Sequence, residues 1–220
     1  LSLALGTANL TPMEVATGWS TFANGGYKIQ PYLIERIESR DGQPLFIANP
    51  ASVPQNSPQD IAALEQPATA TTATIEPAAA ERIIDERTAF ILTSMLQDVI
   101  KRGTGRRALA MGRSDLAGKT GTTNESKDSW FSGYNADYTT TVWSGFDQPE
   151  SLGRSEFGGT VALPIWMNYM SVALKDKPAH LLPEPAGLLT LRVDPITGRA
   201  ASPGNANAYF ELFKSAASPP

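Results

Sequence analysis

Residues Ser114–Tyr134 read "SDLAGKTGTTNESKDSWFSGY" and contain a Gly-Lys-Thr triplet at positions 118–120. Two unrelated chemistries place a lysine and a threonine beside a glycine. One is the binding of a nucleotide phosphate. The other is acyl transfer on a peptide that is bound along a strand. The choice between them largely decides which function the chain is expected to have.

The sequence around the triplet disfavours a phosphate-binding loop. Such a loop needs four residues between its first glycine and the Gly-Lys-Ser/Thr, and a helix whose amino terminus then faces the phosphates. Here Gly112 is the nearest upstream glycine, and five residues separate it from Gly118. The residues after the triplet have no helical apolar period and continue into predicted strands.

The acyl-transfer interpretation takes the segment K-T-G-T-T as an edge strand, which can pair main chain to main chain with an extended peptide. Lys119 supplies a positive charge, and Gly121 lets the backbone come close to a ligand. Thr120 and Thr122 supply hydroxyls that can bind a carboxylate. Thr123 either joins them as a substrate-binding residue or serves only strand propensity and packing. The set suits a peptide that ends in a free carboxylate.

Composition limits the other choices. The chain has 220 residues, 41% of them hydrophobic, so one domain with appendages is expected. A net charge of −4 gives no broad basic field for nucleic acid, and no apolar run approaches the roughly 18 residues of a membrane span. The absence of cysteine excludes thiol nucleophiles and disulfides. The single histidine, His180, lies in a proline-flanked connector, so neither a metal site nor histidine-based catalysis is expected.

The first half of the chain predicts a helix, two strands and a second helix. Thr11-Pro12-Met13-Glu14 is a capping box, and its helix stops at Asn24-Gly25-Gly26. Residues 27–46 read as strand, turn, strand, with the turn at Asp41-Gly42. Asp85 then caps a helix with a predicted buried stripe of Phe90, Ile91, Leu92, Met95, Leu96, Val99 and Ile100.

Between these helices, residues 48–80 are rich in Pro, Ala, Thr, Ser and Gln, which predicts a low-complexity surface insertion or flexible loop. In the second half, strands on either side of the short "NAD" turn at 135–137 form a predicted antiparallel hairpin. Residues 161–175 form a helix that is apolar nearly all round and is expected to be buried. Residues 178–220 are a Pro/Gly/Ala-rich extension with one strand-like run, "GLLTLRVD".

Two further residues of the quoted stretch are expected to have local structural roles. Asp128 is expected to cap or to pair with a neighbour, and Trp130 is expected to pack against the sheet.

Four stretches together carry a family resemblance. "LALGTANLTPMEVATGWSTFANGGY", "MLQDVIKRGTGRRA", "LAGKTGTTNESKDSWFSGYNADYTTTVWSGFD" and "GGTVALPIWMNYM" follow one another in this order. They resemble the transpeptidase domain of the class A bifunctional penicillin-binding proteins. The resemblance implies that residues 1–177 are the C-terminal part of such a domain. It also implies an α/β fold like that of serine β-lactamases and DD-transpeptidases, with a central antiparallel sheet covered by helices in an incomplete domain.

The resemblance implies a function and roles at the site. Family members attack the D-Ala-D-Ala end of a peptidoglycan stem peptide with a serine and pass the acyl group to an amine, and β-lactams trap that serine. Lys119 looks like the catalytic lysine of the third family motif. Thr120, Gly121, Thr122 and Thr123 look like the substrate-binding strand, with the backbone N–H of Thr122 in the oxyanion hole. The expected partners are stem peptides and β-lactam antibiotics, and no cofactor is implied.

The first two family motifs, S-x-x-K and S-x-N, are absent. No serine has a lysine three places on, and none has an asparagine two places on. In the family both motifs lie upstream of the segment that resembles Leu1. We therefore expect the nucleophilic serine and base lysine in an upstream part of the same protein, and we expect this chain alone to be inactive. The family works on the periplasmic face of the bacterial inner membrane, with its anchor and a glycosyltransferase domain outside the part matched here.

Two other functions fit the same residues. The polypeptide is a non-catalytic penicillin-recognising or scaffold module in one, and a serine β-lactamase of the same fold in the other. The two threonines of K-T-G-T-T and the long C-terminal tail favour a transpeptidase, and the rate of deacylation distinguishes it from a β-lactamase.

Overall fold

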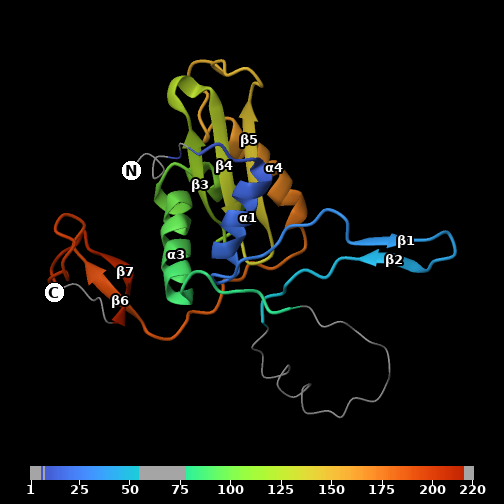
Figure 1. Ribbon diagram of the computed structural model, residues 1–220. Helices are drawn as coiled ribbons and strands as arrows, with labels where there is room; N and C mark the ends of the chain where they lie inside the picture. The colour runs from blue at the N-terminus through green and yellow to red at the C-terminus, as the bar shows by residue number, and fades with distance from the viewer. Residues whose placement is uncertain (1–5, 7, 55–77, 216–220) are drawn as a thin grey trace, which may run out of the picture.

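The computed structural model describes residue 6 and residues 8–54 and 78–215, and it has an α/β fold built on antiparallel strands (Figure 1). Its central sheet has three strands in the order β3-β4-β5, and two further sheets have two strands each, β1-β2 and β6-β7. The helices and strands are α1 (Pro12–Ala23), β1 (Arg36–Glu38), β2 (Pro44–Ile47), α3 (Glu86–Arg102), β3 (Ala117–Thr122), β4 (Asp128–Tyr134), β5 (Thr139–Gly145), α4 (Ala162–Ala173), β6 (Leu188–Val193) and β7 (Tyr209–Lys214), with short 3-10 helices η2 (Arg106–Met111) and η3 (Asn124–Ser126).

The predicted hairpin of β4 and β5 is confirmed. Tyr134 pairs with Thr139, and the register continues without a bulge to Asp128 opposite Gly145. Asn135 fixes the turn, because its Oδ1 accepts hydrogen bonds from the backbone N–H groups of Asp137 and Tyr138. An asparagine that hydrogen-bonds its own backbone in this way supplies the turn that the short connection requires.

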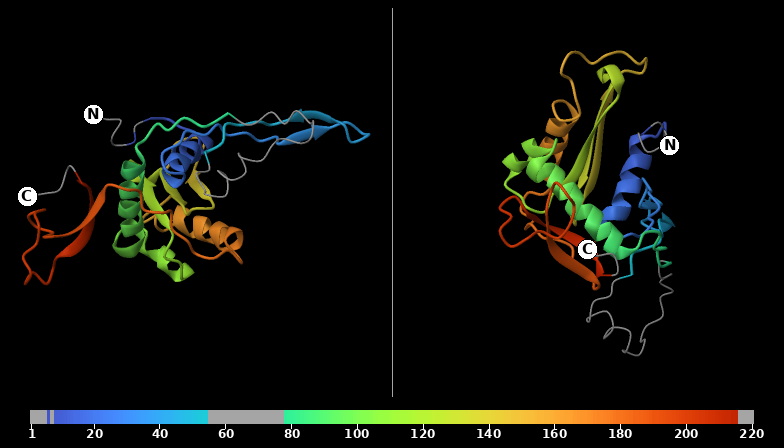
Figure 2. Two further views of the ribbon diagram at one scale, coloured as in Figure 1. Left: turned by 90° about the horizontal axis from the view of Figure 1, so that it is seen from below. Right: turned by 90° about the vertical axis from the view of Figure 1, so that its left-hand side faces the viewer.

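The helices cover the central sheet on two sides. Helices α1 and α3 share one side, and α4 lies on the other (Figure 2). On the α1 and α3 side, Tyr134 packs edge-on against Trp19 and shares a hydrogen bond of 2.8 Å with Thr93. Burial raises the pKa of Tyr134 to about 12, and the bond to Thr93 opposes that rise. On the α4 side, Phe131 packs edge-on against the fully buried Trp166.

The two helix starts predicted from capping residues are confirmed. The backbone N–H of Thr11 donates to Glu14 Oε2 and the N–H of Glu14 donates back to Thr11 Oγ1, which closes the capping box of α1. Asp85 Oδ1 accepts from the N–H of Thr88 at the start of α3. Each bond satisfies an N–H that the first turn of a helix otherwise leaves without a partner.

The predicted buried stripe of α3 is wrong at Met95, which is 55% exposed. The buried positions of α3 are Ala89, Leu96 and Ile100, of which Leu96 and Ile100 pack against residues of the sheet. Met95 lies on a different face of α3 and faces the space beside β7. The apolar surface of α3 is therefore wider than the strip that the sheet covers.

The expectation that α4 is buried all round is also wrong. Its buried residues, Ala162, Leu163, Trp166 and Met170, face the sheet. On the outer side Ile165, Tyr169 and Val172 are about half to three-quarters exposed, at 49%, 57% and 74%. The reason is that α4 forms an outer layer, so within the described residues only one side of it meets the sheet.

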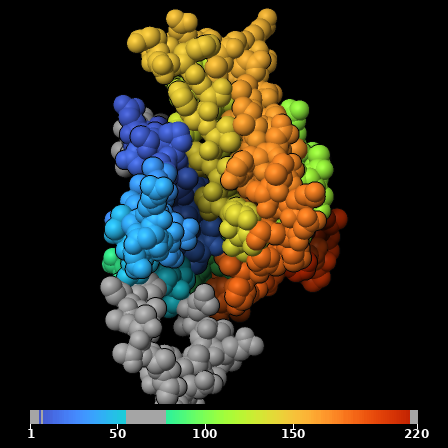
Figure 3. Space-filling view, turned by 90° about the vertical axis from the view of Figure 1, so that its right-hand side faces the viewer, coloured from blue at the N-terminus to red at the C-terminus, as the bar shows by residue number. Residues whose placement is uncertain are grey.

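The side of the molecule opposite α3 shows the β1-β2 hairpin below α1, with a strip of β5 exposed between α1 and α4 (Figure 3). Strands β1 and β2 pair around the predicted turn at Asp41-Gly42, and all their residues are exposed. Ser52 and Ala79 form a parallel bridge, which brings the two ends of the insertion together. The predicted loop character of residues 55–77 lies outside the described residues.

The C-terminal extension contributes a second strand that its composition did not predict. Strand β6 lies within the predicted run, and β7 pairs with it from Val193 opposite Tyr209 to Leu188 opposite Lys214. Two contacts fasten this pair to α3: an ion pair between Lys214 Nζ and Asp85 Oδ1 at 3.1 Å, and Arg102 stacked over the ring of Tyr209. Across the ranges that the structure describes, no helix is long and apolar enough to span a membrane.

Candidate active site at the edge strand β3

Strand β3 carries the predicted site residues and has an open edge. In the described part of the chain its one neighbour is β4, which pairs with it from Ala117 opposite Tyr134 to Thr122 opposite Ser129. Just beyond β3 the N–H of Thr123 donates to the carbonyl of Asp128 at 3.1 Å. Because backbone groups alternate along an antiparallel pair, the N–H groups of Thr120 and Thr122 point to the open edge.

The site residues divide between the two faces of the sheet. Successive side chains of a strand point to opposite faces, so Lys119 and Gly121 lie on one face and Thr120 and Thr122 on the other. Lys119 is exposed, and its Nζ donates to the carbonyl oxygen of Thr120 at 3.0 Å. That contact brings the ammonium group back to the open edge, beside the outward main-chain groups of the strand.

Two residues that the sequence analysis did not single out hold the threonine hydroxyls. Thr104, just after α3, shares a hydrogen bond of 2.7 Å between its Oγ1 and that of Thr120. Thr122 Oγ1 accepts from the N–H of Gly158 at 3.0 Å. Each threonine hydroxyl keeps further hydrogen-bonding capacity for a ligand.

Gly158 lies against the sheet so closely that a side chain would not fit. A Cβ atom at this position would lie 2.4 Å from the carbonyl oxygen of Trp130 and 2.6 Å from that of Gly121. Both atoms belong to backbone that is fixed by the β3-β4 pairing. Gly158 therefore lets the turn before α4 reach Thr122, and only glycine allows that approach.

We expect Gly158→Ala to destabilise the chain by about 1–3 kcal/mol, the usual cost of forcing extra volume into a close-packed place. Gly18→Ala is the matched control, because nothing lies within 4 Å of its added Cβ and alanine favours the interior of α1. Urea unfolding of both variants checks the prediction. If Gly158→Ala were as stable as the parent, the turn before α4 could move away from β3 without lowering the free energy of unfolding.

Thr123 and Asp128 close the turn between β3 and β4. Thr123 Oγ1 donates to Asp128 Oδ2 at 3.1 Å and accepts from the N–H of Asp128 at 2.8 Å. Asp128 Oδ1 accepts from Trp143 Nε1 at 2.9 Å, and the ring of Trp143 lies against that of Trp130. The local roles predicted for Asp128 and Trp130 are confirmed. The hydroxyl of Thr123 is engaged in holding the turn.

A buried ion pair anchors the start of β3. The Asp115 side chain is fully buried and accepts from Arg113 Nη2 at 2.7 Å and Nε at 2.9 Å, and from Asn135 Nδ2 at 3.1 Å. Burial by itself raises the pKa of Asp115, but the hydrogen bonds from Arg113 and Asn135 together lower it below its ordinary value. The half-exposed His180 contributes its backbone N–H to the same carboxylate at 3.4 Å.

Comparison with known proteins places this geometry in a family. The sequence profile of the penicillin binding protein transpeptidase domain matches residues 1–171. Penicillin-binding protein 1A of Pseudomonas aeruginosa is 62% identical over 100% of this chain, which spans 29% of that protein. The crystal structure of penicillin-binding protein 1A from Haemophilus influenzae superposes with a TM-score of 0.84 at 36% identity and covers 100% of this chain and 34% of its own.

A second solved structure shares the fold. It is an imipenem acyl-enzyme complex of penicillin-binding protein A from M. tuberculosis, with a TM-score of 0.50 at 17% identity over 74% of this chain and 31% of that chain. The present chain thus spans about a third or less of the proteins that it matches. Its profile match, its identity to penicillin-binding protein 1A and its fold agree with the resemblance seen in its motifs. The chain belongs to the penicillin-binding protein transpeptidase family.

Proposed function

We propose that β3 is the substrate-binding edge of a peptidoglycan DD-transpeptidase, a serine acyltransferase that cross-links stem peptides and is acylated by β-lactams. The observation that carries this proposal is the open edge of β3. It presents main-chain N–H groups outward beside the Lys119 ammonium and two positioned threonine hydroxyls. An extended peptide can add to such an edge, and its terminal carboxylate can then meet the cationic and hydroxyl groups.

Each residue of the strand has a proposed role in acyl transfer. Lys119 offsets the negative charge of the substrate carboxylate, which Thr120 and Thr122 bind through their hydroxyls. Gly121 leaves the face of the strand open. The outward N–H of Thr122 stabilises the oxyanion that forms when the serine Oγ bonds to the peptide carbonyl carbon. The bond to the terminal D-alanine then breaks, and the serine proton leaves with its amine through the base lysine. Thr123 holds the end of the strand.

The rest of the reaction requires residues that this chain does not contain. We assign the nucleophilic serine and the base lysine to an upstream part of the same protein, with residues 1–177 as the C-terminal part of its transpeptidase domain and residues 178–220 as an extension. We also assign the complete protein to the periplasmic face of the inner membrane. Because the S-x-x-K and S-x-N motifs are absent from these 220 residues, the chain is expected to be inactive alone.

Intact-mass spectrometry after exposure to benzylpenicillin tests this proposal. We expect the full-length gene product to gain the mass of the drug and the 220-residue chain to gain none. Slow loss of the adduct over hours identifies a transpeptidase, whereas loss within seconds identifies a β-lactamase. A full-length product that binds the drug without a covalent adduct would be a penicillin-recognising module. Acylation of the short chain would show that its nucleophile lies within these 220 residues.

A further inference from the structure

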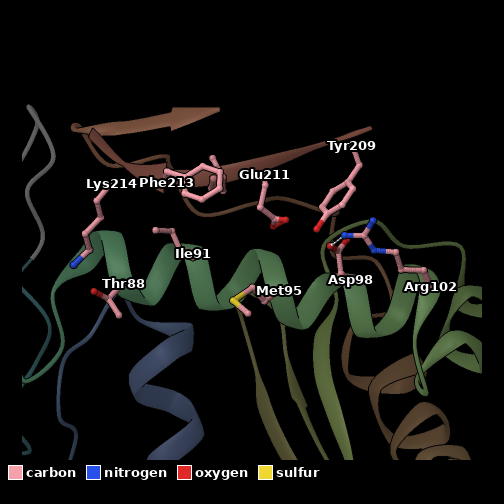
Figure 4. Close-up of a pocket in the computed structure, with 10 residues that line it drawn as sticks. Thr88, Ile91, Met95, Asp98, Arg102, Tyr209, Glu211, Phe213 and Lys214 are labelled. Carbon is pink, nitrogen blue, oxygen red and sulfur yellow. Dashed lines mark hydrogen bonds and ion pairs between the residues drawn. The ribbon is translucent and has the colours of Figure 1, made fainter. Parts of the chain in front are cut away.

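A groove separates the C-terminal strand pair from α3, away from the central sheet. Its volume is about 680 Å³, and α3 stands between it and the sheet (Figure 1). Ile91 and Met95 of α3 form one wall, and Phe213 of β7 lies over Ile91 from the other wall (Figure 4). Tyr209 of β7 points toward Asp98 and Arg102 at one end of the groove (Figure 4). This volume lies within the range of natural ligand sites. About half of Met95 is exposed here.

One carboxylate interrupts the apolar walls. Glu211 of β7 points into the groove between Met95 and Asp98 (Figure 4). Within the residues that the structure describes, no hydrogen bond or ion pair reaches its side chain. Burial raises the pKa of Glu211, the charge of Asp98 raises it further, and the charge of Arg102 opposes them. Glu211 therefore lies in an apolar wall as a charge without its own counterion.

The cations at the two ends of the groove are already engaged. Arg102 forms an ion pair with Asp98, one turn back along α3, and stacks on the ring of Tyr209. At the other end Lys214 pairs with Asp85, a carboxylate that also pairs with Arg87. Of the charged side chains that line the groove, Asp98, Arg102 and Lys214 each have an ion pair and Glu211 has none among the described residues, which leaves one unpaired carboxylate between the two apolar walls. A cation that enters there meets an unpaired carboxylate at a place where water is partly excluded, so the pairing is stronger than at an open surface.

We propose that the groove between α3 and β7 is a docking site for a peptide segment of a partner protein that presents one lysine or arginine between apolar side chains. The basic side chain would pair with Glu211, and its neighbours would cover Met95 and Ile91. A purely apolar segment would leave the Glu211 charge buried and unpaired, which is costly. An acidic segment or an anionic lipid would meet repulsion from Glu211 and Asp98. This proposal does not depend on the proposed transpeptidase activity.

A titration of the full-length gene product, with the ¹⁵N label confined to these 220 residues by segmental labelling, tests the proposal with two peptides. The first is acetyl-Leu-Val-Lys-Val-Leu-amide, and the second has glutamate in place of the lysine. We expect saturable shifts of backbone amides confined to α3 and β7 with the lysine peptide, and none with the glutamate peptide. Glu211→Gln should lower the affinity for the lysine peptide by roughly tenfold or more, as expected for the loss of a charge-assisted hydrogen bond. Met95→Trp, at an exposed position, should abolish binding by filling the groove.

Two controls make the result specific. Glu150→Gln removes the same charge from an exposed loop and should leave the affinity unchanged. Glu211→Gln should be at least as stable as the parent in urea, because it removes a charge that burial disfavours at neutral pH. The proposal is overturned if the lysine peptide does not bind or if both peptides bind alike. It is equally overturned if Glu211→Gln and Met95→Trp leave the affinity unchanged, or if the shifted amides belong to β3.

Discussion

Thr122→Pro is expected to slow the acylation of the full-length gene product by benzylpenicillin by roughly 10²–10³-fold, the usual effect of removing one oxyanion-hole donor. Proline lacks the backbone N–H, and the N–H of Thr122 points away from β4 to the open edge of β3. The substitution therefore removes no hydrogen bond of the sheet, and edge strands are where sheets accept proline. It also removes the hydroxyl that accepts from Gly158, so its effect is compared with that of a variant that loses the hydroxyl alone. The effect should appear in the acylation rate, with the fold retained.

Thr122→Val separates the two contributions of this residue. Valine keeps the N–H but loses the hydroxyl that accepts from Gly158 and is proposed to bind the substrate carboxylate. We expect it to slow acylation by about tenfold, the scale of one hydrogen bond to a charged group. Stopped-flow acylation rates and urea unfolding of both variants provide the measurement. If proline slows the reaction no more than valine does, the N–H of Thr122 does not contribute to the oxyanion hole.

Asp115→Ala is expected to lower the free energy of unfolding by about 3–5 kcal/mol, the usual cost of breaking a buried ion pair from one side. The substitution leaves the Arg113 guanidinium, which is only 13% exposed, without its carboxylate. It also removes the acceptor for Asn135, which forms the β4-β5 turn, and for the backbone of His180. Glu38→Ala is the matched control, since its ion pair with Arg36 is exposed and should contribute at most about 1 kcal/mol.

The pH dependence of stability provides a second measurement on Asp115. Its pKa is lower in the folded chain than in the unfolded chain, where a value of about 3.9 is usual. Its stabilising contribution is therefore fully present above about pH 4 and is lost as the pH falls through the folded-state pKa. Urea unfolding from pH 6 downward should show a smaller loss of stability for Asp115→Ala than for the parent. Parallel curves would mean that the pKa of Asp115 is the same in the folded and the unfolded chain.

The parts of the fold that could be predicted from the sequence depend on neighbours along the chain. Thr11 and Glu14 predict the start of α1, because both partners of the capping box lie within one turn. The "NAD" turn predicts the β4-β5 hairpin for the same reason. The family motif then identified the strand that became the open edge β3. The helix faces were harder to predict, because apolar Met95 and Val172 follow the same period as the residues that face the sheet.

The support of the candidate site comes from residues far away in sequence. Gly158 reaches Thr122 across 36 positions, and His180 reaches Asp115 across 65. No periodicity relates such pairs, and each residue alone looks like an ordinary loop glycine or connector histidine. Thr104 is nearer, but it meets Thr120 only because α3 ends beside β3. These contacts needed the three-dimensional arrangement of helix, strand and turn, which single-sequence patterns do not give.

The bridge near the β1-β2 hairpin suggests where new sequence can be added to this protein. The N–H of Ser52 donates to the carbonyl of Ala78, and the N–H of Ala80 donates to that of Ser52. The chain thus leaves and returns at one point, whatever lies between Pro54 and Ala78. Doubling the length of a flexible connection between fixed ends costs only about 0.6 kcal/mol. A fluorescent reporter with adjacent termini, grafted between these residues, would mark the complete protein in living cells while leaving the strand β3 untouched.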